Sequence, residues 1–158
     1  MSGRPTRRFA FEAFLPRDKK ERAVIIDELK NETRTIIIYE APHRLIRTVT
    51  ELMNGIGDRE LTVCRELTKK HEEKMQTTFS ELLEYSKEHE PRGEYVLVIC
   101  GRSRSEVIEE KQQSWENMPL EEHMAYYENQ GVDHKEAMKL VAKDRGVSKR
   151  DIYKQLLE

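Results

Sequence analysis

Two short apolar segments that end abruptly in polar residues constrain the fold of this chain most strongly. Residues 35–40 run directly into Ala-Pro-His-Arg at 41–44, and residues 61–64 run into Arg-Glu-Leu-Thr-Lys at 65–69. An unbroken apolar run indicates a strand in a sheet that helices cover on both faces. In such sheets, ligands bind outside the carboxyl ends of the strands. We therefore expect the two polar clusters to form one shared site.

Strand and helix patterns alternate through the first two thirds of the chain. Apolar alternation and continuous apolar runs predict strands, whereas apolar residues at helical spacing predict helices. Pro42 suits the first turn of one helix, and Ser80 is expected to cap another. Together these patterns predict an α/β layer structure. The expected strands cover residues 9–15, 33–40, 61–65, 77–79 and 95–100, with helices at 18–30, 42–53 and 80–89.

The first of these strands is rich in aromatic residues. Phe9, Phe11 and Phe14 alternate with small or polar side chains and follow Arg7 and Arg8. Aromatic and basic residues together are compatible with a nucleic-acid patch. The alternation favours the other interpretation, which is that the rings form a buried strand face.

Residues 119–158 carry the signals of three short, capped helices. Asp133 and Glu136 form one capping box, and Ser148 and Asp151 form another. The joint at Gly146 resembles a helix-turn-helix, although a small bundle that binds nothing has the same pattern. The candidates for nucleic-acid contact are Lys149, Arg150 and Lys154. We therefore expect an α/β domain at residues 1–104, a linker or loosely held helix at 105–118, and the helical tail at 119–158.

Composition excludes several classes of function. The formal net charge is −2, so the overall charge does not indicate nucleic acid, although both ends of the chain are locally basic. Cys64 and Cys100 lack metal-binding spacing and are expected to be buried, unpaired thiols. No apolar run approaches the roughly 20 residues of a membrane span, and no signal peptide is visible. We expect a cytoplasmic protein with no membrane partner and no metal.

The polar clusters at the strand ends carry the groups of a ligand pocket. Arg44 and Arg65 would attract an anion such as phosphate. Glu40 or Glu66 would accept hydrogen bonds from a ribose, and Gly93 would let a ligand approach the backbone. The alternative is a rim of ion pairs that binds nothing. Glycine-rich nucleotide loops, HExxH and GxSxG motifs are absent from the sequence.

Several strings of residues, in the same order, resemble the tetrapyrrole methylase superfamily and, within it, the methyltransferases of small-subunit ribosomal RNA. The resemblance covers residues 2–101 and continues more weakly into the tail. Ala13 stands where the family string Phe-x-Gly-Phe-Leu-Pro has glycine. The strings lie at residues 2–9, 11–16, 39–45, 65–69 and 92–94.

This resemblance implies a fold and an activity. The fold is a mixed sheet of about five strands flanked by helices, which is the second domain of the family architecture. The activity is transfer of a methyl group from S-adenosylmethionine to the ribose 2'-hydroxyl of a cytidine in small-subunit (16S) rRNA, within the 30S subunit. Because the chain begins where the family's second domain begins, we expect a C-terminal half that lacks the N-terminal domain and is inactive alone. The family also implies a homodimer.

The resemblance further implies site residues. Arg44, Lys69 and Lys70 are placed as RNA contacts. Glu40 and Glu66 are the candidates of this half for the catalytic base, and the alternative is a base in the other half. The residues implied to line the donor pocket are Tyr39, Glu40, Ala41, Arg65, Glu66, Thr68, Gly93 and Glu94.

Two alternatives remain open at this point. The chain could be an RNA- or DNA-binding module without catalysis, but the strand-end clusters would then have no role. It could also be a methylase domain for a small tetrapyrrole of the precorrin type. The basic helical tail argues against that substrate, because a small molecule needs no such arm.

Overall fold

The computed structural model describes residues 2–157, except for the side chain of residue 116, and it divides into two compact units. The units are Met1–Ser103 and Arg104–Glu158. Residues 1 and 158, the outer ends of the expected domains, lie outside the described part. The segment 105–118, expected as a linker or a loose helix, belongs to the second unit and is mostly helical.

The first unit is an α/β structure with a five-stranded mixed sheet, which confirms the predicted fold class. The strand order is β1-β2-β5-β3-β4, with β1 and β2 parallel and the other neighbours antiparallel. Since β5 runs against both of its neighbours, β2 and β3 point the same way. The elements are β1 (Phe9–Phe14), α1 (Lys19–Glu28), the 3-10 turn η1 (Leu29–Asn31), β2 (Thr35–Glu40), α2 (Pro42–Ile56), β3 (Glu60–Arg65), β4 (Glu73–Thr78), α3 (Phe79–Glu88) and β5 (Tyr95–Ile99).

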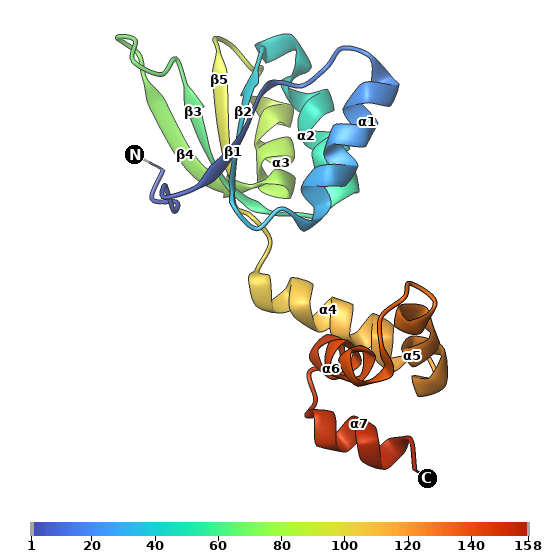
Figure 1. Ribbon diagram of the computed structural model, residues 1–158. Helices are drawn as coiled ribbons and strands as arrows, with labels where there is room; N and C mark the ends of the chain where they lie inside the picture. Colours follow the sequence, from blue (N-terminus) through green and yellow to red (C-terminus); the bar gives the residue numbers. More distant parts are fainter. Residues whose placement is uncertain (1, 158) are drawn as a thin grey trace. The chain divides into compact units, whose positions relative to one another are not determined.

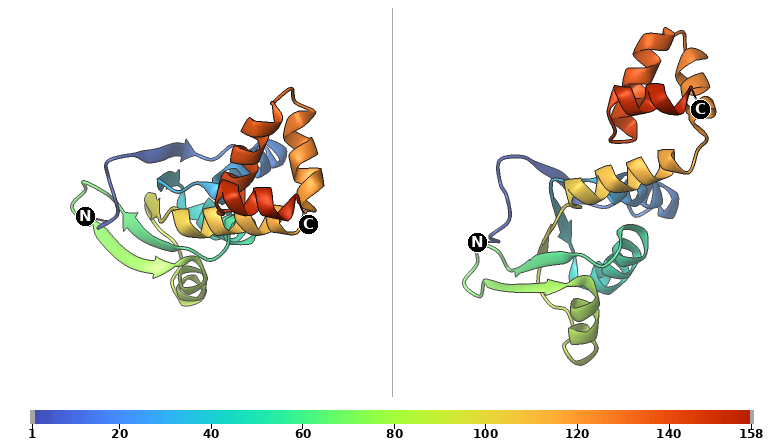
Figure 2. Two further views of the ribbon diagram at one scale, coloured as in Figure 1. Left: turned by 60° about the horizontal axis from the view of Figure 1, so that its bottom comes forward. Right: turned by 90° about the horizontal axis from the view of Figure 1, so that it is seen from below.

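Helices α1, α2 and α3 cover one face of this sheet (Figures 1 and 2). Each joins two parallel strands, and such crossovers are right-handed in nearly all proteins. The connections β1–β2 and β2–β3 cross the sheet in one direction. The connection β4–β5 crosses the sheet in the opposite direction, and its two strands also run opposite to β1, β2 and β3. A right-handed connection therefore places all three helices on the same face.

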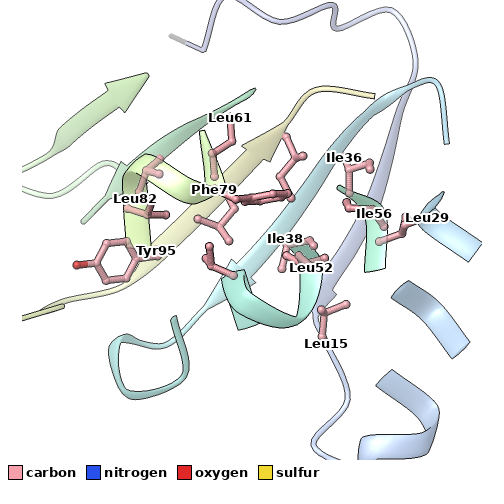
Figure 3. Close-up of a cluster of buried hydrophobic side chains, with 14 of the residues drawn as sticks. Leu15, Leu29, Ile36, Ile38, Leu52, Ile56, Leu61, Phe79, Leu82 and Tyr95 are labelled. Carbon is pink, nitrogen blue, oxygen red and sulfur yellow. The ribbon is translucent and has the colours of Figure 1, made fainter. Parts of the chain in front are cut away.

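The core lies between this face and the helices. Ile36 and Ile38 of β2 and Leu97 of β5 are fully buried there. Phe79, the first residue of α3, lies in the middle of the cluster (Figure 3). The opposite face of the sheet is only partly covered, since Tyr39 is 38% exposed. The expectation that the β2 run is buried on both faces is therefore wrong for this unit.

The aromatic residues of β1 point away from the core. Phe9, Phe11 and Phe14 are 49%, 52% and 56% exposed, whereas Ala10 is buried. The register with β2 explains this, because Ala10 pairs with the buried Ile36 and must share its face. The expectation of a buried aromatic face is therefore wrong. We call the exposed group of Phe9, Phe11, Phe14 and Tyr39 the aromatic surface.

A clamp at Arg22 joins α1 to α2. Arg22 is 3% exposed and donates to both carboxylate oxygens of Glu51, at 2.5 and 3.0 Å. It also donates to the backbone carbonyls of Pro16 and Arg17, each at 2.9 Å. The hydrogen bond from Arg22 lowers the pKa of Glu51, against the opposing effect of burial.

The start of α3 differs from the prediction. Its N-cap is Thr78, whose hydroxyl accepts from the backbone of Glu81 while Glu81 returns a hydrogen bond to the Thr78 N–H. Ser80, the expected cap, lies in the first turn and donates to Asp58 at 2.6 Å. Thr78 takes the role because it ends β4 in an extended conformation, as an N-cap requires.

The second unit is helical. Its core is formed by apolar residues of α5, α6 and α7, among them Met124, Val141 and Ile152. The predicted boxes hold in part: Asp133 caps α6, and Ser148 and Asp151 form a reciprocal box at α7. Its helices are α4 (Arg104–Glu116), α5 (Leu120–Glu128), α6 (His134–Asp144) and α7 (Lys149–Gln155).

This unit also buries a polar network that the sequence did not reveal. His123 is fully buried and stacks on Trp115, with ring centroids 4.1 Å apart. Arg145 Nε donates to His123 Nδ1 at 3.2 Å, and the other ring nitrogen lies 3.3 Å from Asp144. Burial lowers the pKa of His123, so its ring is neutral at pH 7.

Within residues 2–157, no helix is both long and apolar enough to cross a bilayer.

The backbone at Ala13 provides a first prediction. Ala13 has φ of +49° at a register shift in β1, where a side chain costs about 1–2 kcal/mol. Ala13→Gly relieves this strain, and we expect it to raise the free energy of unfolding by about 0.5–1 kcal/mol. The gain is smaller than the strain because glycine loses more chain entropy on folding. Urea denaturation measures this change. Ala10→Gly, in regular backbone of the same strand, should lower stability, and a destabilised Ala13→Gly would contradict the proposed strain.

The clamp predicts a pH dependence. Because the folded state lowers the pKa of Glu51 below its usual 4.5, the ionised carboxylate stabilises the fold above that pH. This contribution disappears as the pH falls through the lower folded value. Glu51→Gln should therefore cost about 2 kcal/mol at pH 7 and flatten the loss of stability below pH 4.5. Glu84→Gln, at an exposed pair with Lys87, is the control; identical acid profiles for Glu51→Gln and wild type would contradict the assignment.

Candidate functional site

The carboxyl ends of β2 and β3 meet at one edge of the sheet. Glu40 of β2 and Arg65 of β3 both pair with Tyr95, the first residue of β5. They lie two strand spacings apart, about 10 Å. Figure 1 shows this edge at the top of the sheet, where the β3–β4 hairpin ends and β5 begins. The topology thus brings the two predicted polar clusters together around the start of β5.

The β2 end divides between the two faces of the sheet. Tyr39 belongs to the aromatic surface, where Phe11 and Phe14 contact its ring edge-to-face at 5.2 and 5.8 Å. Glu40 points to the helix-covered face and is 1% exposed. It accepts from the Ala41 N–H at 2.9 Å and from the Thr48 hydroxyl at 2.6 Å. Glu40 therefore holds the first two turns of α2 against the strand.

Arg44 contributes to the same buried anchor. Its Nε lies 3.4 Å from Glu40, and it donates to the carbonyl oxygen of Leu15 at 2.9 Å. The Arg44 side chain is 20% exposed. Its guanidinium therefore ties α2 to the end of β1, and the part left for an external anion is small.

Four predicted residues form a second group, which we call the rim cluster: Glu66, Lys69, Gly93 and Glu94. The Glu66 N–H donates to the Glu94 carbonyl at 2.9 Å, and the Glu94 N–H donates to Glu66 Oε1 at 2.8 Å. Lys69 Nζ lies 2.9 Å from the Glu94 carboxylate and 3.2 Å from that of Glu66. The cluster therefore joins the β3–β4 hairpin to the loop before β5.

The charges of the rim cluster stabilise one another. The Glu94 N–H and then the Lys69 ammonium lower the pKa of Glu66. The carboxylates of Glu94 and Glu66 raise the pKa of Lys69. Glu66 is thus ionised and Lys69 protonated throughout the neutral range. The group presents carboxylate oxygens that can accept further hydrogen bonds.

The remaining predicted residues lie elsewhere. Arg65 is on the helix-covered face and pairs with Glu73 at 2.5 Å, which raises its pKa. Thr68 and Lys70 are exposed at the tip of the hairpin. The predicted nucleic-acid contacts of the tail all lie on α7 in the second unit, where Lys149 is half-buried and the other two are exposed: Lys149, Arg150 and Lys154.

Sequence reasoning did not find a hollow of about 620 Å³ in the first unit, bordered by α3 and the β3–β4 hairpin. The single sequence signal for it is the spacing of Tyr85 and His89, which places two rings one helical turn apart. The rings stack with centroids 4.0 Å apart. Of the residues predicted to bind the donor, Arg65 lines this hollow.

With this geometry established, comparison with known proteins identifies the family. Residues 2–83, just over half of the chain, match the family described as Tetrapyrrole (Corrin/Porphyrin) Methylases. The chain belongs to the tetrapyrrole methylase family. The matched region includes the β2 and β3 ends and the β3–β4 hairpin. The family predicted from the strand-end strings is confirmed.

The chain is also similar to curated proteins named Ribosomal RNA small subunit methyltransferase I. The Bacillus subtilis (strain 168) relative is 45% identical over 92% of this chain and 49% of the relative. The Halalkalibacterium halodurans relative is 41% identical over 96% of this chain and 52% of its own length. The Escherichia coli O157:H7 relative is 33% identical over 99% and 53%, respectively. The chain spans about half the length of the curated relatives it matches.

The rim cluster predicts a coupling between two residues. Gly93 has φ of +78°, and a Cβ there would lie 2.6 Å from Glu66 Oε1. Gly93→Ala should therefore lower the free energy of unfolding by about 1–3 kcal/mol, through backbone strain and displacement of Glu66. Combining it with Glu66→Ala removes the clash. The double variant should therefore lose about 1 kcal/mol less unfolding free energy than the two single variants lose in sum. Additive effects would show that the carboxylate does not fill this space.

Proposed function

We propose that this chain takes part in methylation of small-subunit ribosomal RNA, with S-adenosylmethionine as the methyl donor and a cytidine ribose 2'-hydroxyl as the acceptor. The names of its relatives and its family membership support this activity. The structural observation that carries it is the convergence of the β2 and β3 ends around the start of β5. Ligands of sheets flanked by helices bind at such an edge.

The residues of this edge fit the donor. A ribose diol and an ammonium group are hydrogen-bond donors, and the carboxylates of Glu66 and Glu94 are acceptors. A sulfonium cation is also favoured beside these charges. Tyr39 offers a partly exposed ring on which an adenine could stack, and the absence of a side chain at Gly93 leaves the space that the Glu66 carboxylate fills. When bound, S-adenosylmethionine supplies an electrophilic methyl group.

The two acids take binding or positioning roles in this proposal. Glu40 is enclosed by Thr48, Arg44 and the start of α2, so it positions that helix without touching a substrate. Glu66 has a lowered pKa, which makes it a good hydrogen-bond acceptor but a weak proton acceptor at pH 7. We therefore assign Glu66 to donor binding and leave the base for the ribose hydroxyl outside these two residues.

Basic side chains at the surface support the RNA part of the proposal. Lys70 lies on the exposed hairpin tip beside the rim cluster, whereas Arg150 and Lys154 lie on α7. Contacts of lysine and arginine with phosphates weaken as salt increases, because binding releases counterions. Binding to 30S subunits should show this dependence, whereas binding of a small tetrapyrrole should not. A homodimer stays a prediction of the family resemblance.

A reconstitution experiment tests the proposed function. The chain alone should transfer no methyl group to 30S subunits, and it should become active when mixed with the remaining half of the Bacillus subtilis relative. Glu66→Gln should lower the donor affinity of the mixture about tenfold or more, because it replaces a charged acceptor. Glu84→Gln, an exposed acid of α3, should leave it unchanged.

The readout is labelled methyl incorporation followed by nucleoside analysis. A 2'-O-methylcytidine product supports the proposal. Label on a base, or incorporation that the chain alone supports at full rate, contradicts the assigned acceptor or the predicted dependence on a second half. Failure of any mixture to label RNA overturns the proposed activity.

A further inference from the structure

The hollow beside α3 has the size of a small-ligand site. Its volume is about 620 Å³, within the range of roughly 300–1,000 Å³ typical of ligand pockets. It is lined by residues of α3, the β3–β4 hairpin and the segment before β5. Val63, Leu82 and Tyr95 are buried apolar or aromatic residues of its wall. Their side chains belong to the core, so the wall is rigid.

A flat pair of rings borders the hollow. Tyr85 and His89 stack with an interplanar angle of 1° and centroids 4.0 Å apart. Tyr85 is 48% exposed, so a large part of its surface is available to a ligand. Exposed aromatic rings of this kind are the usual platforms for nucleobases, because every base has a flat apolar face.

Positive charge borders the same hollow. Arg65, Lys74 and Arg92 line it together with two carboxylates, those of Glu73 and Glu90. Arg65 pairs with Glu73 and Arg92 pairs with Glu90, so Lys74 is the cation of this lining for which no ion pair is found among the described residues. An anionic group would meet its positive charge.

Arg65 borders the hollow with part of its side chain. One end of its guanidinium pairs with Glu73, and the side chain is 31% exposed. Its Nε is buried and out of reach of a ligand, so an anion meets the exposed part of the side chain. Phosphate suits this side chain, because arginine binds phosphate through its N–H groups.

We propose that this hollow binds a nucleotide, with its base stacked on the Tyr85–His89 pair and its phosphate beside Arg65. The same chemistry is presented by a free nucleotide and by an unpaired nucleotide of RNA. The inference goes beyond the proposed function, because it concerns a hollow on the helix-covered face and requires no methyl transfer. Arg65 and Glu66 are consecutive, so the hollow adjoins the rim cluster proposed for the donor.

Binding to the complete chain tests this inference. Cytidine 5'-monophosphate and a six-nucleotide single-stranded RNA are titrated separately while the Tyr85 and His89 ring signals are followed by NMR. Stacking should move these ring signals upfield. Tighter binding of the oligonucleotide identifies RNA as the source of the nucleotide, whereas equal or tighter binding of the monophosphate identifies a free nucleotide. Both results support the site.

Matched variants separate stacking from general charge. Tyr85→Ala should weaken binding at least fivefold, whereas Tyr85→Phe keeps the ring and should bind like wild type. Lys74→Ala should lower the salt dependence of RNA binding by about 0.7 in log–log slope if Lys74 contacts a phosphate. Lys87 is an exposed lysine of α3 that does not line the hollow, so Lys87→Ala should leave the salt dependence of RNA binding unchanged.

Three results overturn the inference: no shift of the Tyr85 ring signals with either ligand, equal binding by the alanine and phenylalanine variants, or RNA binding that depends on Lys87 as much as on Lys74. The proposed methyl transfer is measured independently in the reconstituted mixture. Loss of nucleotide binding with methyl transfer intact would remove this site and leave the proposed function standing. The substituted side chains are exposed, so the variants should fold like wild type. Urea denaturation of each variant checks this.

Discussion

The insertion of β5 between β2 and β3 is the constraint on which the rest of the first unit depends. Leu97 and Ile99 of β5 are fully buried, and burial of each such side chain contributes about 1.5–3 kcal/mol. Because β5 runs against both neighbours, β2 and β3 must be parallel and must end at the same edge. The loop before β5 then lies between those ends, where Glu94 and Gly93 meet Glu66.

Coverage of only one face follows from the same topology and determines which surfaces remain available. The helices bury the side that carries Ile36, Ile38 and Glu40. The aromatic surface of β1 and β2 remains on the other side. Glu40 and Arg44 anchor α2 on the helix-covered face. Tyr39, which precedes Glu40 in the same string, is accessible on the other face. A polar cluster at a strand end is therefore not one chemical unit.

The consecutive residues Arg65 and Glu66 connect the two candidate sites. Arg65 continues the alternation of β3 and borders the hollow beside α3, whereas Glu66 leaves the strand with φ of +52° and joins the rim cluster. A donor at the rim and a nucleotide in the hollow would thus meet at one backbone turn.

The sequence alone determined the order and type of most elements, because apolar period and helix caps are local signals: β2, β5, the Pro42 start of α2 and the Ser148–Asp151 box all follow from them. It also determined the family. The tertiary structure decided the faces and partners of the side chains. Whether Phe11 is buried depends on the register of β1 with β2, and whether Glu40 is accessible depends on Thr48 and Arg44. Those contacts join residues through the folded sheet and its helices, so no local pattern could have specified them.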